Sequence, residues 1–124
     1  MTAESDIAWY GLQTWQSLND SAGKAIHNHE PHETLTAAGA ASIWGITVLN
    51  SASAACNATL ADGEMIGQIK TFVMSNASNS STVTVAHHIT SDPEVFTFAQ
   101  VGDTLVLLWD GTDWITLVNV GAAT

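Results

Sequence analysis

The segment from Val101 to Val118 constrains the fold more than any other part of the chain. Its two apolar runs, Thr104–Trp109 and Trp114–Val118, flank the polar sequence Asp110-Gly111-Thr112-Asp113. Two strand-forming runs joined by a short turn of this composition predict a β-hairpin. Both runs are rich in Val, Leu, Ile and Trp and almost free of charge. We therefore expect both faces of the hairpin to lie against other protein, with the two tryptophans in the core.

The composition indicates a domain that does not stand alone. The 124 residues suit one domain. Hydrophobic residues make up 46% and charged residues 11% of the chain, against about 25% charged residues in an ordinary soluble domain. So little charge cannot cover a lone domain of this size. We therefore expect part of the surface to be covered by other copies of the chain, in a homotrimer, or by a partner.

The charge balance excludes several classes of partner. Twelve acidic residues stand against two basic ones, Lys24 and Lys70, which gives a net charge of −10. Such a chain cannot neutralise phosphates, so we expect it to bind neither nucleic acid nor an anionic membrane surface. No apolar stretch approaches the roughly 20 residues of a transmembrane helix. The acidic N-terminal sequence also predicts that no export signal is present.

The chain changes character near Thr34. Residues 1–33 mix polar and charged residues without regular alternation. Residues 34–124 contain short apolar runs separated by Gly, Asn, Asp and Ser about every ten residues, which is typical of a sandwich or small barrel. We predict an all-β protein, with a small antiparallel β-sandwich or jelly-roll-like domain at 34–124 and an extended N-terminal arm at 1–33. The domain should contain no helix longer than two turns.

Seven strands are predicted in this domain, at Ser42–Leu49, Cys56–Leu60, Met65–Met74, Ser81–Ala86, Val95–Phe98, Thr104–Trp109 and Trp114–Val120. Asp62-Gly63 and Asp110-Gly111 are predicted to supply the positive φ of tight turns. The segment 34–41 consists of small residues, which favour either close packing at a subunit boundary or a plain loop. Cys56 is the only cysteine, and we expect it to be buried as a small apolar residue.

Aromatic residues in the arm are the candidate partner-binding site. A short helical turn would project Trp9, Leu12 and Trp15 to one side, with Tyr10 beside them. Side chains of this kind need a place to be buried, either against the β domain or on a partner. Because aromatic anchors dominate many interfaces, we predict that these four residues bind the partner.

A histidine cluster at the end of the arm is the one candidate metal site. His27, His29 and His32 are interleaved with Glu30 and Glu33, which are residue types that bind transition metals. The segment also contains a proline and matches no metalloenzyme motif. A solvated or interface-facing polar link is the alternative reading. On this basis we assign no metal ligand and no cofactor.

The remaining polar residues do not indicate an enzyme. His87-His88 is expected at the polar end of a strand, and Lys70 at a sheet edge or in a salt bridge. The carboxylate pairs beside the two Asp-Gly sequences fit turn formation better than acid and base catalysis across a cleft. The sequence holds no nucleophile elbow, phosphate loop, dinucleotide fingerprint or CxxC pair. We therefore predict no catalytic residues.

Three motifs recur in a known arrangement. The chain contains LTAAGA from Leu35, then Asp62-Gly63 followed by Gly67-Gln68 and Lys70, then Trp109-Asp110-Gly111-Thr112 and Trp114. The segment from Thr34 to Ala122 resembles a recurrent β module of tailed-bacteriophage virion proteins. That module runs from a TLTAAGA opening through an LxDGxxGQxK hairpin to a WDGTxW hairpin.

The resemblance implies a virion structural role. Modules of this kind occur in tail fibres and on capsid surfaces. A single small domain with a short arm suits a decoration or cement protein, which forms trimers on the capsid exterior and clamps neighbouring major capsid subunits. A tail-fibre, spike or other tail component is the first alternative. A carbohydrate-binding β-sandwich module is the second.

Overall fold

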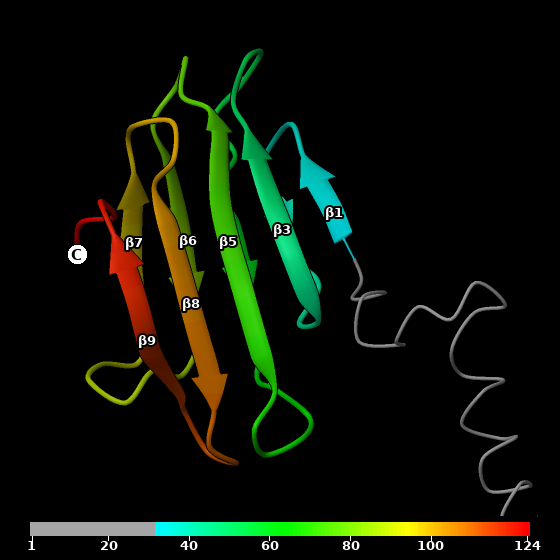
Figure 1. Cartoon of the computed structure of the whole chain (residues 1–124), viewed down its shortest axis with the longest axis vertical. Helices are drawn as coiled ribbons and strands as arrows, with labels where there is room; N and C mark the ends of the chain where they lie inside the picture. Colours follow the sequence, from blue (N-terminus) through cyan, green and yellow to red (C-terminus); the bar gives the residue numbers. More distant parts are fainter. Residues whose placement is uncertain (1–31) are drawn as a thin grey trace, which may run out of the picture. The chain divides into compact units, whose positions relative to one another are not determined.

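The computed structural model describes residues 32–124, which contain strands and no helix. The all-β prediction is confirmed for this part of the chain (Figure 1). Accordingly, no helix within 32–124 has the length and apolarity needed to cross a membrane. Residues 1–31 of the predicted arm lie outside the described residues, and its last two residues, His32 and Glu33, belong to the first strand rather than to an arm. The strands are β1 (His32–Leu35), β2 (Gly39–Ala40), β3 (Gly45–Asn50), β4 (Ala58–Leu60), β5 (Ile69–Asn76), β6 (Ser81–Val85), β7 (Glu94–Phe98), β8 (Thr104–Trp109) and β9 (Trp114–Val120).

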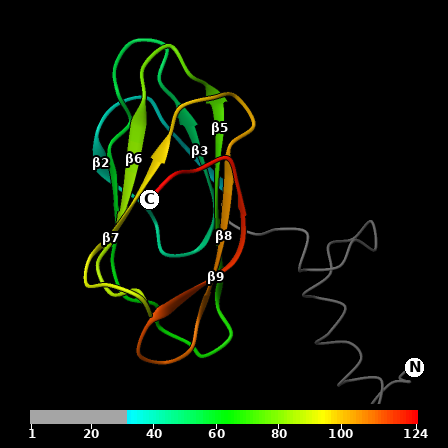
Figure 2. The same ribbon diagram turned by 90° about the vertical axis from the view of Figure 1, so that its left-hand side faces the viewer.

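The strands form two sheets that lie face to face (Figure 2). The larger sheet has the order β1-β3-β5-β8-β9, and the smaller one has the order β2-β4-β6-β7. Alternate side chains of both sheets meet in one apolar core. Its largest fully buried apolar members are Trp114, Phe72, Phe98, Leu49, Leu60, Met74, Leu105 and Leu107.

The antiparallel prediction is wrong for the N-terminal half of the domain. Strands β1, β3 and β5 pair parallel to one another, and so do β2, β4 and β6. From β1 to β6 the chain crosses to the opposite sheet after each strand. Consecutive strands in this part of the chain therefore reverse direction but belong to different sheets. Neighbours within one sheet therefore point the same way. The antiparallel pairs are β5 with β8, β6 with β7 and β8 with β9.

All seven predicted strands are present, some with shifted ends, and two more strands precede them. The segment 34–41 is not the plain loop that was one of its two predicted structures. It completes β1 and contains the two-residue β2, which pairs with β4. Cys56 is fully buried, as predicted. In β6 the valines face the core and the threonines lie outward and half-buried, as the alternation indicates.

The hairpin predicted at the C-terminal end of the chain is confirmed. Strands β8 and β9 pair antiparallel with Trp109 opposite Trp114, and Gly111 has a φ of 103°. The two indole rings are buried, with centroids 5.3 Å apart. One face of the hairpin thus lies in the core. Within the described residues the other face is open, because Leu117, Val118 and Val120 are exposed.

The second Asp-Gly sequence has a different role from the predicted one. The connection from β4 to β5 is no hairpin, because the two strands belong to different sheets. Gly63 lacks the expected positive φ, which occurs at Gly67 instead (93°). A Cβ atom on Gly63 would lie 2.4 Å from Cγ of Trp109. Glycine is therefore required at position 63 by close packing against an indole ring.

Candidate functional site

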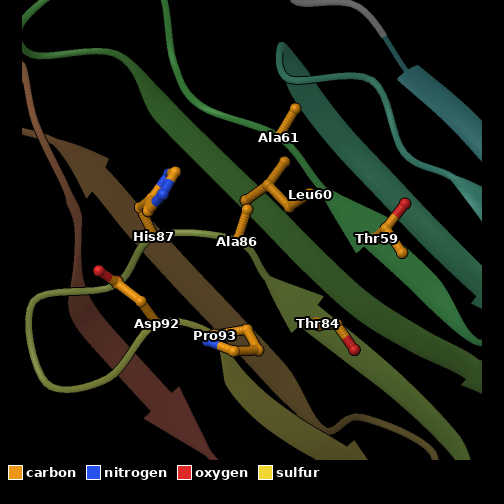
Figure 3. A pocket seen from close by; sticks show the side chains of 8 residues that line it. All are labelled: Thr59, Leu60, Ala61, Thr84, Ala86, His87, Asp92 and Pro93. Atoms are coloured by element: carbon orange, nitrogen blue, oxygen red, sulfur yellow. The ribbon is translucent and has the colours of Figure 1, made fainter.

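Three connections meet at one end of the domain: residues 61–68 between β4 and β5, 86–93 between β6 and β7, and 110–113 between β8 and β9 (Figure 1). Two open depressions lie there, of about 520 Å³ and about 370 Å³. Leu60, Ala86 and Pro93 give the larger one apolar walls (Figure 3). His87 and Asp92 line both depressions, so we treat them as one candidate site.

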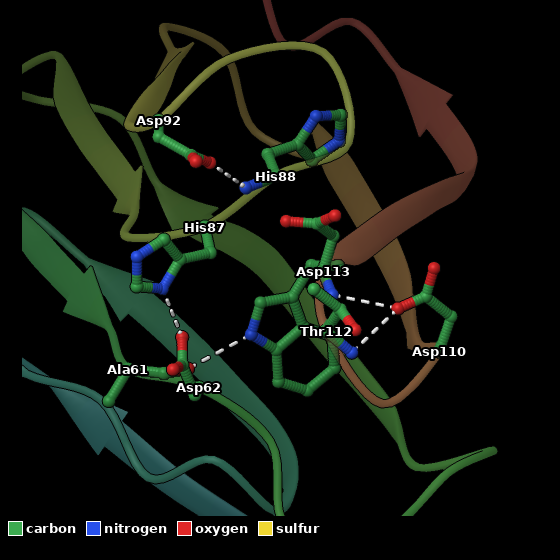
Figure 4. A network of polar contacts seen from close by, with 9 residues as sticks. Ala61, Asp62, His87, His88, Asp92, Asp110, Thr112 and Asp113 are labelled. Carbon is green, nitrogen blue, oxygen red and sulfur yellow. Dashed lines mark hydrogen bonds and ion pairs between the residues drawn. The ribbon is translucent and has the colours of Figure 1, made fainter.

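The centre of the site is an ion pair between two connections. Leu60 of β4 pairs in parallel with Val85 of β6, which places Asp62 beside His87 two residues further on. Their Oδ1 and Nδ1 atoms are 2.6 Å apart, and each side chain is about half exposed (50% and 49%; Figure 4). The hydrogen bond and charge of Asp62 raise the pKa of His87, and Asp92 and Asp113 raise it further.

Hydrogen bonds to the backbone fix the surrounding connections. The indole N–H of Trp114 donates to the carbonyl of Ala61 over 2.9 Å, and its amide donates to the carbonyl of His87 over 3.0 Å. Asp92 accepts from the amide of His88 at 3.1 Å (Figure 4). Both histidines follow β6 directly, as predicted, but the ring of His88 is buried and bonded to two threonine hydroxyls.

The carboxylate of Asp110 forms the turn, as the sequence indicates. One of its oxygens accepts from the amides of Asp113 and Thr112, at 2.7 and 2.8 Å. These bonds lower the pKa of Asp110. Asp113 itself lines the smaller depression with Asp62 and Asp92. The site therefore combines three carboxylates with one histidine on an open surface.

This arrangement can accept hydrogen bonds and attract cations. A base that activates a serine, threonine or cysteine is hydrogen-bonded to it, and no hydroxyl or thiol is bonded to His87 within residues 32–124. The same part of the chain brings no three metal-binding side chains together. The interaction that the structure shows at the site is the ion pair of Asp62 and His87.

A second polar group lies inside the core and corrects the expectation for Lys70. This residue belongs to β5, the middle strand of the larger sheet, and is fully buried, so it lies at no sheet edge. Its ammonium group donates to the hydroxyl of Thr47 at 2.6 Å and to the carbonyl of Trp44 at 3.0 Å. It also lies 5.2 Å from the ring centroid of Phe72. Burial lowers the pKa of Lys70 to about 8, although Glu33 opposes the shift.

Thr47 connects this lysine to Glu33. Its hydroxyl donates to Oε2 of Glu33 over 2.6 Å, and the same oxygen accepts from the amide of Ser42 at 2.7 Å. Burial would raise the pKa of Glu33, but these two bonds and the charge of Lys70 lower it. We call this set the Lys70–Thr47–Glu33 relay. Because its lysine is fully buried, we assign it to holding β1, β3 and β5 together.

Most of the candidate site residues named from the sequence are not among the residues that the structure describes. Trp9, Tyr10, Leu12 and Trp15 are outside the described residues, as are His27, His29 and Glu30. Of the predicted histidine cluster, His32 is exposed on β1 and Glu33 belongs to the relay.

The ion pair of Asp62 and His87 and the Lys70–Thr47–Glu33 relay were both missed from the sequence. The parallel pairing of β4 with β6 would have revealed the ion pair, had it been foreseen, since parallel strands align residues at equal distances beyond their ends. No family model matches this chain, and no curated protein matches it at a significant level.

Proposed function

We propose that this chain is a bacteriophage virion structural protein, a decoration protein that binds the major capsid protein on the outer surface of the capsid. It acts there as a homotrimer that clamps neighbouring capsid subunits, without catalysis, cofactor or nucleic acid. In this proposal the two sheets form a sandwich-like domain, and the residues that precede β1 form an extended arm.

One observation carries the proposal. The residues on which the resemblance to the phage module rests contact one another in the structure. The amide of Gly67 donates to the carbonyl of Trp109 over 2.8 Å, and the amide of Trp109 donates to the carbonyl of Gln68 over 2.9 Å. The side chain of Gln68 donates to the carbonyl of Ile43 at 2.6 Å. Gly63 packs on Trp109. Two motifs about 45 residues apart thus form one structural unit, as expected of a scaffold module.

Attachment is assigned to the arm. Trp9, Tyr10, Leu12 and Trp15 supply large aromatic and apolar side chains, which are the residue types that anchor protein interfaces. In the described domain, the open site at the Asp62–His87 end is acidic and half exposed, which is less suited to a tight apolar anchor.

The number of copies per particle tests the location. Quantitative mass spectrometry of purified virions of the phage that encodes the chain should give a number in the hundreds, comparable with that of the major capsid protein. A few copies per particle would assign the chain to the tail, which is the alternative reading. Absence from virions combined with affinity for glycans would favour the carbohydrate-binding module.

Substitution in the full chain tests the arm. Replacing Trp9 and Trp15 together by alanine should reduce co-sedimentation with capsids at least tenfold, since truncating one such anchor often removes about 2 kcal/mol of binding energy. Trp44→Ala is the matched control, because it removes a half-buried tryptophan from the β domain. Equal binding by the double variant and the wild type would exclude the arm as the attachment site.

A further inference from the structure

One face of the larger sheet is apolar and turned away from the core. Alternation along β3, β5 and β8 points every second side chain outward. The strand register sets these side chains in rows across the sheet, such as Ile46, Thr71, Val106 and Val118. We call this surface the outer sheet face, and its principal apolar members are Ile46, Ile69, Val106, Leu108, Val118 and Val120.

The outer sheet face carries no acidic residue and no lysine. Of the ionisable residues on the five strands, Glu33 and Lys70 belong to the inward-pointing relay, and His32 lies at the edge on β1. The other acidic residues within 32–124 lie in connections or on β7 of the smaller sheet. The sheet thus has a charged pair inside and an uncharged surface outside.

The size of this face approaches that of an interface. Five strands about 4.8 Å apart and six residues at about 3.3 Å each give roughly 500 Å² in projection. Monomers rarely expose apolar patches larger than a few hundred Å². A specific interface takes about 800 Å² from each partner. The outer sheet face alone would supply roughly 500 Å² of this area, which is more than half.

We propose that the outer sheet face binds further copies of this chain and forms the contact of the homo-oligomer. The distribution of charge on the surface favours this occupant. Each copy carries −10, so two copies repel each other wherever their carboxylates come face to face. Copies can approach through the outer sheet face without facing carboxylates. The same surface offers no charge with which to select a foreign partner.

The inference deepens the oligomer part of the proposed function, but its test needs no particle. If the chain were a monomer in solution, the self-association surface would be wrong, while the copy number on virions would remain an independent result. If the chain were absent from virions, self-association through this face could still hold.

Charge placed on the face is the first test. Sedimentation equilibrium of the full-length protein should give multiples of 13.0 kDa. Val118→Asp should raise the dissociation constant at least about a hundredfold, because it buries unpaired carboxylates in the contact. Val95→Asp is the matched control: both valines lie on edge strands and are similarly exposed, 46% for Val118 and 42% for Val95, but Val95 belongs to the smaller sheet. It should leave the assembly unchanged.

A monomeric wild type up to several hundred micromolar would overturn the inference. Equal dissociation of the two aspartate variants, or dissociation of Val95→Asp alone, would overturn it as well. Thermal melts of both variants show whether the loss of assembly is a loss of fold.

Thiol labelling is the second test, and it introduces no charge. Val118→Cys should react with a maleimide several-fold more slowly at high protein concentration than at low, whereas Val95→Cys should react at one rate throughout. The native Cys56 is buried and gives a low background. Equal labelling rates for Val118→Cys at all concentrations would contradict the inference. Slow labelling of Val118→Cys that persists on dilution would contradict the inference too. It would indicate that another part of the same chain covers the outer sheet face.

Discussion

The two faces of the larger sheet differ in an unusual way, because the buried face holds a charged group and the outer face is mostly apolar. The inner face holds the buried charge of Lys70, linked through Thr47 to Glu33, among apolar core residues. The outer face holds valine, isoleucine and leucine with threonine between them, and much of it is exposed in the single chain. Buried charge stabilises a fold only weakly, and exposed apolar surface marks contact sites. The comparison assigns strand arrangement to the inner face and, in our proposal, association to the outer face.

The largest expected effect is a difference in the free energy of unfolding between substitutions on the inner face and on the outer face. Trp114→Ala and Trp109→Ala should each lower the free energy of unfolding by roughly 3–5 kcal/mol, since each empties a large core site. Val118→Ala on the outer face should change the stability of the monomer by no more than about 0.5 kcal/mol. Urea unfolding at concentrations too low for assembly measures all three. Comparable losses for tryptophan and valine would show that the outer face is part of a core.

A titration of stability tests the buried lysine. Between pH 8 and 10.5 the folded state releases the proton of Lys70, whose pKa is about 8, while the unfolded state retains it. The unfolded state then binds more protons, so stability rises with pH, by about 3 kcal/mol across this interval. Urea unfolding at pH 7.5 and 10.5 measures the change. Lys70→Met should lack this rise, and parallel curves for the two proteins would contradict the assignment.

Breaking the relay at its centre should have a smaller effect. Thr47→Val removes the hydroxyl that joins Lys70 to Glu33 and leaves a buried donor with one partner fewer, so unfolding should become easier by about 2 kcal/mol. Thr47→Ser keeps the hydroxyl and should restore most of the loss, as measured by chemical denaturation. If valine were as stable as threonine, the inner face would depend on packing alone.

The smallest expected effect concerns the ion pair of Asp62 and His87, which lies in the connections at one end of the domain and on neither face of the larger sheet. His87 has a raised pKa because of Asp62, so Asp62→Asn should lower it, as followed by NMR titration of the imidazole. The pair favours the folded state at acidic pH, and this contribution fades as the pH rises above 6.5 through the raised pKa of His87. Asp110→Asn is the control, because Asp110 bonds its own turn. An unchanged His87 pKa in Asp62→Asn would mean that the ion pair does not form in solution.

The sequence predicted the strands well because burial and alternation are local signals. Strands β8 and β9 have the predicted bounds, and Trp109 and Trp114 lie in the core as expected. The turn at Gly111 was also predictable, since an Asp-Gly sequence between two apolar runs favours positive φ. Strands β1 and β2 were not, because four and two residues of small or polar character give too short a pattern.

Strand direction and the sites that follow from it could not be predicted in this way. Alternation is the same in parallel and antiparallel strands, so it did not reveal that the chain crosses between sheets after each early strand. Asp62 and His87 therefore seemed unrelated, although the pairing of β4 with β6 places them together. Lys70 was expected at a sheet edge or in a salt bridge, and its partners were not foreseen because Thr47 and Glu33 come from strands far away in the sequence.

An image of the intact particle tests the central claim most directly. Electron cryomicroscopy of virions of the phage that encodes this chain should show the β domain repeated over the capsid lattice, with the outer sheet faces of neighbouring copies in contact. Copies confined to the tail, or a lattice in which the outer sheet face points into solvent, would contradict the account.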